Sequence, residues 1–399
     1  MGTKLQKLLV FLLFVFLPSQ LGYHFWPEWS FVNGIRVDYF SPTIYFTDLF
    51  ILGILALWFV ERPMIRLNAH KLIVVGLVLL VSGLMSQSPM LAGYKTFRLV
   101  WYFLFGVYWF RKGHNFQKEF IWGLSIALVY TSFLAVFQFI NQSSVGGMWY
   151  WLGERAYSVS TPGIAKTFVA PFGMLVRSYA TFPHPNLLAA FLVTTSALLI
   201  SVNKKLTQWF WFIPAMALVV AGSRFGMAAT LLLLAVVVWG KTRKEYKRGI
   251  TGVILTLAIL ALFFPGNPES FAERAVLNQR AVRLAAENLP FGVGFGNFVL
   301  ASSKLDGIIK TNLVLQPVHN VFLLVLAELG IVGLLVFIKG FAMWAKATLR
   351  SRNLYLIGLL VIVVGWGMID HFWLTLHQGT LLLAVIISQT ALQSKSKNL

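Results

Sequence analysis

The sequence contains no cysteine, and acidic residues are scarce. The absence of cysteine excludes disulfide bonds, zinc–thiolate sites and catalysis by a thiol. Lysine and arginine number 33 against 13 aspartate and glutamate residues, and charged residues make up only 12% of the chain. Because 58% of the residues are hydrophobic, a soluble domain could not cover the apolar surface. The composition therefore predicts a polytopic membrane protein.

About twelve apolar segments are predicted to form transmembrane helices within a single integral membrane domain, residues 1–399. They cover residues 7–24, 43–60, 71–86, 96–110, 118–141, 185–202, 207–222, 225–240, 249–265, 319–338, 354–370 and 373–391. The first segment follows Lys4 and Lys7 as in a signal peptide, but no small-residue cleavage site comes after it. We therefore expect this segment to be retained in an all-α polytopic fold.

Lysine and arginine gather in every second connection between these segments. With the N-terminus in the cytoplasm, the cytoplasmic connections are short and basic, as at Lys241, Arg243, Lys244, Lys247 and Arg248. This distribution follows the positive-inside rule and predicts that both termini are cytoplasmic. The net charge of +20 then reflects membrane topology, so we expect membrane lipids rather than nucleic acid as partners.

Two outer connections are long, residues 142–184 and residues 266–318. Loops of this length in a compact membrane domain are usually functional or contain structure of their own. The second contains apolar residues at helical spacing, namely Leu277, Ala281, Leu284 and Ala285. This spacing predicts a short amphipathic helix at the membrane interface, ended by Pro290. The alternating glycines of residues 290–298 predict a tight turn, because no βαβ pattern surrounds them.

Polar residues recur where these helices begin or end on the outer side. The residues concerned are His184, Asn186, Ser223, Arg224, His319, Asn320, Asp370 and His371. Each has an ordinary explanation as an interface anchor or a helix cap. Together with the loop arginines Arg274, Arg280 and Arg283, however, they predict a site that binds an anion and contains a base.

Glu328 lies within the apolar segment that begins at His319. Nine residues of helix turn it about 180° away from His319 and place it about 13 Å deeper, so it cannot easily orient that histidine. We favour a structural hydrogen-bonding role over a catalytic one for this carboxylate. The outer loops contain neither a His-Glu-x-x-His nor an Asp-x-Asp pattern, so we expect no metal and no other cofactor.

Several segments together resemble the O-antigen ligase and polymerase family. They are His184-Pro-Asn-Leu-Leu-Ala189, Gly222-Ser-Arg224, Pro290-Phe-Gly-Val-Gly-Phe-Gly-Asn-Phe298, and Pro317-Val-His-Asn-Val-Phe322 followed by Glu328-Leu-Gly330. The likeness is concentrated in residues 180–340. It implies a glycosyltransferase of the GT-C type in the bacterial cytoplasmic (inner) membrane, with the active site facing outward.

The resemblance also implies the substrates and the residues that act on them. The donor would be a glycan on an undecaprenyl-diphosphate carrier, and the acceptor a hydroxyl of a lipid, a glycan or a protein. Catalysis would be metal-independent and, by motif match, would depend on Arg224 and His319. The expected substrate-binding residues are Arg274, Arg280, Asn320, His184 and Asn186; for the loop arginine, Arg283 also stays open.

The sequence leaves several activities open. The chain could act as a ligase, as a polymerase that extends the carrier-linked glycan, or as a protein O-glycosyl ligase. A transporter of lipid-linked glycans is less favoured, because the sequence shows no internal repeat and few charges within the apolar segments. The sugar and the acceptor stay unidentified.

The charge distribution makes a prediction about topology. Alkaline phosphatase fused after residue 290 should be active, and the same enzyme fused after residue 399 should be inactive, because only the first junction lies outside. Phosphatase activity in cells expressing each fusion measures this, with immunoblotting to equalise expression. An active fusion at residue 399, or an inactive one at residue 290, would contradict the two-sided arrangement.

Overall fold

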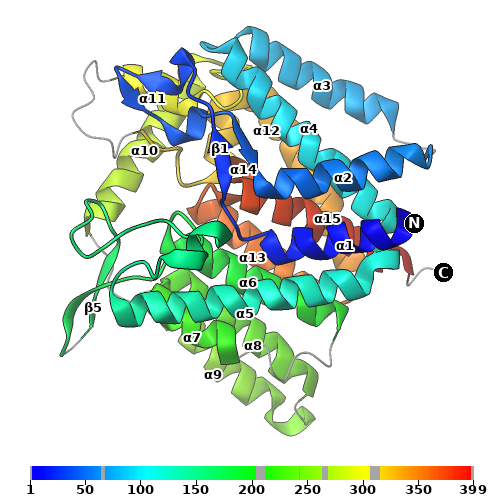
Figure 1. The fold of residues 1–399 in the computed structure, drawn as a ribbon, viewed down its shortest axis with the longest axis vertical. Helices are drawn as coiled ribbons and strands as arrows, with labels where there is room; N and C mark the ends of the chain where they lie inside the picture. The colour runs from blue at the N-terminus through cyan, green and yellow to red at the C-terminus, as the bar shows by residue number, and fades with distance from the viewer. Residues whose placement is uncertain are drawn as a thin grey trace.

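The structure is a computed structural model that describes residues 2–63, 68–169, 171–203, 212–241, 243–262, 268–305 and 315–396. The described part of the chain is mostly helical (Figure 1). Four predicted features extend outside these ranges: the segments 207–222 and 249–265 and the loops 142–184 and 266–318.

Each predicted apolar segment overlaps a helix. These helices are α1 (Gly2–Phe16), α2 (Phe46–Val60), α3 (Ala69–Leu84), α4 (Pro89–Lys112), α5 (Gln117–Asn141), α6 (Pro185–Val202), α7 (Phe212–Ala221), α8 (Arg224–Lys241), α9 (Lys244–Leu262), α12 (Val321–Arg350), α13 (Leu354–Ile369) and α15 (His377–Ser396). Among the described residues, three stretches are long and apolar enough to cross a membrane: Pro89–Asn141, Pro185–Val202 and Val321–Arg350. Several of the other helices are apolar but shorter, so the number of crossings stays a prediction.

The connections contain strands, which the all-α prediction did not include. Three antiparallel pairs form: β1 (Gly22–His24) with β4 (Thr43–Tyr45), β2 (Phe31–Val32) with β3 (Ile35–Arg36), and β5 (Lys166–Val169) with β6 (Gly173–Val176). In the β2–β3 hairpin, Asn33 and Gly34 have φ of 49° and 78°. Two positive φ values suit the tight hairpin turn that follows the twist of its strands. The strands arise because chain outside the helices still needs backbone hydrogen-bond partners.

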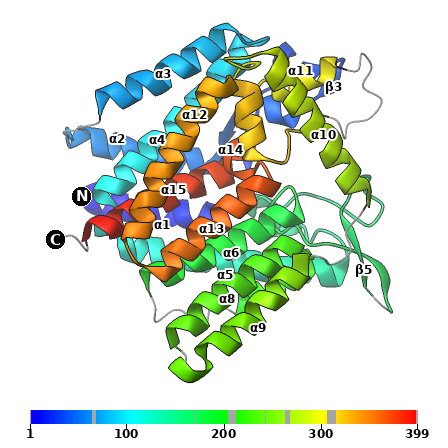
Figure 2. The same cartoon turned by 180° about the vertical axis from the view of Figure 1, so that it is seen from behind.

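The two termini lie at one end of the helices, and the elements of the long loops lie at the other (Figure 1). The reverse view shows the same separation, with β5, α10 (Pro268–Glu287) and α11 (Phe298–Lys304) far from both termini (Figure 2). This arrangement agrees with long loops on the side opposite the termini. Which side faces the cytoplasm stays a prediction.

The core is built around α6, of which nearly every residue is buried. It contacts α5, α7, α8 and α13. A helix that is apolar all round needs such enclosure, because it has no polar face to present to water. A second part of the core joins α1, α4 and α5 through Phe14, whose ring meets Trp109 and Phe120 edge-on at 4.9 Å each. Rigid packing of this kind fixes the helix ends where polar side chains lie.

The predicted amphipathic helix is confirmed as α10. Its four expected inward residues, Leu277, Ala281, Leu284 and Ala285, are all buried. The surroundings differ from the prediction, however, because this face packs on α11 and α12 rather than on lipid at the interface. The protein itself supplies the apolar partner surface that the sequence pattern requires.

The glycine turn at residues 290–298 crosses α12 where that helix breaks. Gly330 has φ 64° and ψ −167°, which removes it from helical geometry. The carbonyls of Ala327 and Glu328 instead accept hydrogen bonds from Val293 N and Gly294 N, both at 2.9 Å. Glu328 also accepts through its carboxylate from Gly296 N at 2.9 Å and Phe298 N at 3.3 Å, which supports the structural role predicted for it.

Replacing Gly330 by alanine should destabilise the protein. A Cβ there would lie 2.0 Å from Pro290 O, and the backbone conformation alone costs about 1–3 kcal/mol for other residues. Gly340→Ala in the same helix is the matched control, because its Cβ would meet no atom within 4 Å. Thermal unfolding in detergent should show a lower midpoint for Gly330→Ala only; equal midpoints would contradict the packing at the break.

Candidate functional site

A cavity of about 1540 Å³ lies where the long loops meet the ends of α6, α8 and α13. It is lined by most of the predicted site residues, namely His184, Asn186, Arg224, Arg274 and His319. Among the described residues, Arg280 and Asn320 are not part of its lining. The structure thus brings together five side chains that come from four separate parts of the chain.

The Gly-Ser-Arg segment forms the corner between α7 and α8. Gly222 has φ 58°, and a Cβ there would lie 3.2 Å from the Arg177 Nε atom. Ser223 accepts a hydrogen bond from Gly226 N at 3.2 Å and so caps α8. Arg224 is the first residue of α8, where the backbone N–H groups and the helix dipole also favour an anion. The short segment therefore ends one helix, caps the next and places a guanidinium at the cavity.

Arg177 is a third arginine of the site that sequence reasoning did not identify. Its Nε donates to Ala221 O at 2.8 Å and its Nη2 to Asn186 Oδ1 at 2.8 Å. Burial, together with the charges of Arg224 and Arg274, lowers the pKa of Arg177 to about 10. Such mutual repulsion is relieved when an anion binds among the guanidinium groups. The signal in the sequence was weak, because Arg177 lies in the middle of a loop without a motif.

Arg274 is held beside the other arginines by the end of α13. Its Nη1 donates to Ile369 O at 3.3 Å. Burial lowers the pKa of Arg274, while the nearby charges of Asp370 and Glu273 oppose that effect. Of the loop arginines, Arg280 donates to Ser302 Oγ at 3.4 Å, and the exposed Arg283 donates to Glu287 at 2.8 Å. Only Arg274 among these three therefore lines the cavity.

His319 lies against the junction between α13 and α14 (Phe372–Thr375). Its Nδ1 is 3.6 Å from Asp370 Oδ2, an ion-pair separation that is slightly longer than a hydrogen bond. The His371 ring lies beside it, with centroids 5.0 Å apart. Asp370 is held by Phe372 N, which donates to its Oδ1 at 3.1 Å. The carboxylate that can orient His319 is thus Asp370, which the sequence placed only on the same side of the membrane.

The charge states of this group follow from burial and from neighbours. Burial raises the pKa of Asp370, but the imidazoles of His319, His371 and His184 outweigh burial and hold it well below its usual range. Burial lowers the pKa of His371 to about 4, and burial with the charge of Arg177 lowers that of His184 to about 3. Near neutral pH, Asp370 is therefore ionised while His184 and His371 are neutral. An ionised carboxylate facing Nδ1 leaves Nε2 of His319 as the proton acceptor.

The two asparagines and His184 also have structural contacts. Asn320 Oδ1 accepts from Phe322 N at 2.9 Å and Leu323 N at 3.0 Å, so it caps α12. His184 caps α6 by accepting from Asn186 N at 3.1 Å. These contacts fix the helix ends from which His319 and Asn186 face the cavity. Binding of substrate by these residues stays a prediction.

His319, Asp370 and His371 also form a set that could in principle hold a metal ion. Their candidate ligand atoms lie within 4.8 Å of one another. Two of these atoms, His319 Nδ1 and Asp370 Oδ2, lie 3.6 Å apart, which zinc bonds of about 2.0–2.2 Å allow. The charge of Arg274, however, acts on both Asp370 and His371 and would repel a cation. The surroundings therefore fit a base beside an anion better than a divalent metal.

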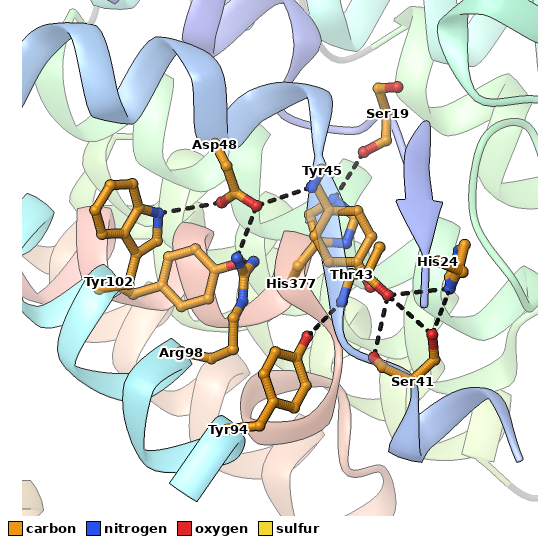
Figure 3. Close-up of polar contacts among 11 residues, drawn as sticks. Ser19, His24, Ser41, Thr43, Tyr45, Asp48, Tyr94, Arg98, Tyr102 and His377 are labelled. Carbon is orange, nitrogen blue, oxygen red and sulfur yellow. Dashed lines mark hydrogen bonds and ion pairs between the residues drawn. The ribbon is translucent and has the colours of Figure 1, made fainter. Parts of the chain in front are cut away.

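A buried ion pair stabilises another wall of the cavity (Figure 3). Arg98 Nη1 lies 2.7 Å from Asp48 Oδ2, which also accepts from Tyr45 N at 2.8 Å. The Tyr45 ring stacks on His377 with centroids 3.5 Å apart, and Tyr102 contacts Arg98. Because each charge has a partner, this wall is best understood as a rigid support.

Comparison with known proteins identifies the middle of the chain. Residues 209–338 match the family model described as O-antigen ligase. The matched segment includes Arg224, Arg274 and His319 and confirms the resemblance that the motifs indicated. No curated protein matches the chain.

Proposed function

We propose that this chain, with an O-antigen ligase domain at residues 209–338, transfers a glycan from undecaprenyl diphosphate to a hydroxyl acceptor. Membership of residues 209–338 in that family supports a membrane glycan transferase acting on lipid-linked glycans. The observation that carries the finer proposal is the arrangement of Arg177, Arg224 and Arg274 beside the His319–Asp370 pair in one cavity. The proposed location is the bacterial cytoplasmic membrane, with this cavity facing outward.

The proposed reaction separates two roles. The bond between the anomeric carbon and the diphosphate oxygen breaks, and its electron pair leaves with the diphosphate. The arginines stabilise this developing charge, since a guanidinium binds phosphate oxygens in pairs and stays charged next to lipid. Each such donor contributes about 3–4 kcal/mol to the transition state.

The acceptor is activated at the other side of the cavity. Its hydroxyl proton moves to Nε2 of His319 while its oxygen forms the new bond to the anomeric carbon. Asp370 then stabilises the imidazolium that results, because it is already ionised and buried beside Nδ1. A base of this kind contributes on the order of 100- to 10,000-fold in rate. This chemistry requires no metal, since arginine supplies the positive charge.

The acceptor distinguishes the remaining activities. A ligase would transfer the glycan to a lipid, a polymerase to another carrier-linked glycan, and a protein O-glycosyl ligase to a serine or threonine. All three use the same base and the same leaving group. A transporter is less favoured, because the His319–Asp370 pair supplies a base beside the arginines, which transport does not require.

Variants of Arg224 and His319 should affect different steps. Arg224→Lys should weaken carrier binding and slow transfer by about 100-fold or more, because an ammonium cannot reproduce the paired contact with the diphosphate. His319→Ala should bind the carrier almost normally and lose about 100- to 10,000-fold in the chemical step. Carrier binding and single-turnover transfer, measured on purified folded protein, separate the two effects.

The remote exposed residues Arg283 and His114 provide matched controls as Arg283→Lys and His114→Ala. Asp370→Asn should resemble His319→Ala, since a neutral amide cannot stabilise the imidazolium. If His319→Ala transfers glycan at nearly the wild-type rate, the histidine is only part of a helix end and the proposed base is wrong.

Strong chelation should leave transfer unchanged. The charge of Arg274 beside the His319–Asp370–His371 group disfavours a divalent cation there. Purified protein treated with excess EDTA and then dialysed should transfer glycan at the untreated rate. Lost activity that returns with magnesium, manganese or zinc would show that the reaction depends on a metal.

A further inference from the structure

The cavity extends well beyond the arginines and the His319–Asp370 pair. One wall is formed by the N-terminal outer segment, residues 22–45, and the facing rim by residues 153–167 of the first long loop. Neither stretch contains a residue of the proposed diphosphate site or the proposed base. Both carry charged side chains into the lining, namely Arg36, Asp38, Glu154, Arg155 and Lys166.

Arg36 is presented to the cavity by an aromatic support. It ends strand β3, and its guanidinium lies over the Trp26 ring at 4.5 Å. Its Nε forms an ion pair with Asp38 Oδ1 at 4.0 Å, too far for a hydrogen bond, and 62% of each of these side chains is exposed. Stacking therefore orients the Arg36 side chain while its N–H donors stay available to a ligand.

Arg155 faces the cavity from a different element. The preceding residue, Glu154, is buried and accepts from Val145 N, Gly146 N and Gln138 Nε2, each at 2.7 Å. The charge of Glu154 is thus compensated inside the loop, and its bonds fix the backbone that carries Arg155. Within the described ranges, Arg155 donates no hydrogen bond to another residue.

His24 lies beside Arg36, because both side chains lie against the Trp26 ring, with the His24 and Trp26 centroids 5.7 Å apart. Its Nδ1 is 3.0 Å from Thr43 Oγ1 and 3.2 Å from Ser41 Oγ, contacts that fix the imidazole on β1 (Figure 3). Burial lowers the pKa of His24; Asp38 opposes this effect, and the charges of Arg36 and Arg155 add to it. Arg36, Arg155 and His24 therefore line the same cavity, and the charges of both arginines reach the imidazole.

This second group of cations differs from the first. Arg36 lies over the Trp26 ring in the wall of residues 22–45, whereas Arg177 is hydrogen-bonded to Ala221 O and Asn186 Oδ1, and Arg274 to Ile369 O. Tyr39 lies between the two ends of the cavity, because its ring meets the His371 ring edge-on at 5.6 Å. His371 in turn lies beside His319. A molecule held at Arg36 and Arg155 would therefore extend along Tyr39 toward the proposed base.

We propose that Arg36, Arg155 and His24 form a second anion subsite, which binds a phosphate or carboxylate group on the acceptor sugar. The assignment to the acceptor rests on the proposed function, because the subsite leads to the side of the cavity where His319 takes the hydroxyl proton. Paired guanidinium donors and one neutral imidazole suit either anion. The acceptor is thereby expected to be an acidic glycan rather than an uncharged one or a peptide.

Binding of small sugars to the full-length protein in nanodiscs tests the subsite. Glucose 6-phosphate and glucuronate represent the two anions, and glucose is their neutral counterpart. By saturation-transfer NMR titration, at least one acidic sugar should bind about tenfold more tightly than glucose. Arg36→Gln and Arg155→Gln should each remove most of that difference, while the exposed outer control Arg283→Gln should not. Comparing glucose 6-phosphate with glucuronate identifies the preferred anion.

Pyrophosphate separates this subsite from the proposed diphosphate site. Arg224→Gln should abolish pyrophosphate binding and keep the acidic sugar, whereas Arg36→Gln should do the opposite. Acidic sugars that bind no better than glucose, or that bind the Arg36→Gln/Arg155→Gln double variant unchanged, would overturn the subsite. If the two variants show these selective losses and the wild-type protein transfers no glycan from undecaprenyl diphosphate, the proposed function is overturned and the subsite stays in place.

Discussion

Glu328 accepts backbone hydrogen bonds from the glycine turn, and the helix that carries it breaks two residues later at Gly330. Within the same glycine turn, Phe295 N donates to Ser82 Oγ of α3 at 2.9 Å. Asn297 Oδ1 accepts from Ser88 N at the start of α4 at 3.0 Å. One buried carboxylate thus ties α3, α4 and the end of α10 to α12. Because α10 carries Arg274 and His319 lies just before α12, the distance between Arg274 and His319 depends on this junction.

The cavity is unusual in how its charges are compensated. Asp48 pairs with Arg98, and Glu154 accepts hydrogen bonds from Val145 N, Gly146 N and Gln138 Nε2, so each of these acids already has partners. Asp370 is the ionised carboxylate beside His319, and its charge also reaches Arg274. This distribution of charged side chains suits a negatively charged ligand.

Much of the fold could be predicted from the local sequence pattern. The apolar segments, the helix through Leu277 and Leu284, and the glycine turn follow from periodicity and from residues with special backbone freedom, which neighbours in the sequence determine. Arg177 and the Asp370 partner of His319 depend on contacts between distant parts of the chain, which no single segment specifies. The wall at residues 22–45 was missed for a related reason, because its short strands form only where helix ends leave backbone groups to pair.

The grouping of Arg177, Arg224 and Arg274 has a consequence for turnover. Under the proposed reaction, the diphosphate enters as a diester and leaves as a monoester, which carries an additional ionisable oxygen. The same guanidinium groups therefore hold the spent carrier more firmly than the loaded one. Under the proposed reaction, this tighter binding slows departure of the spent carrier, and any enzyme that removes a phosphate from the released carrier would favour turnover.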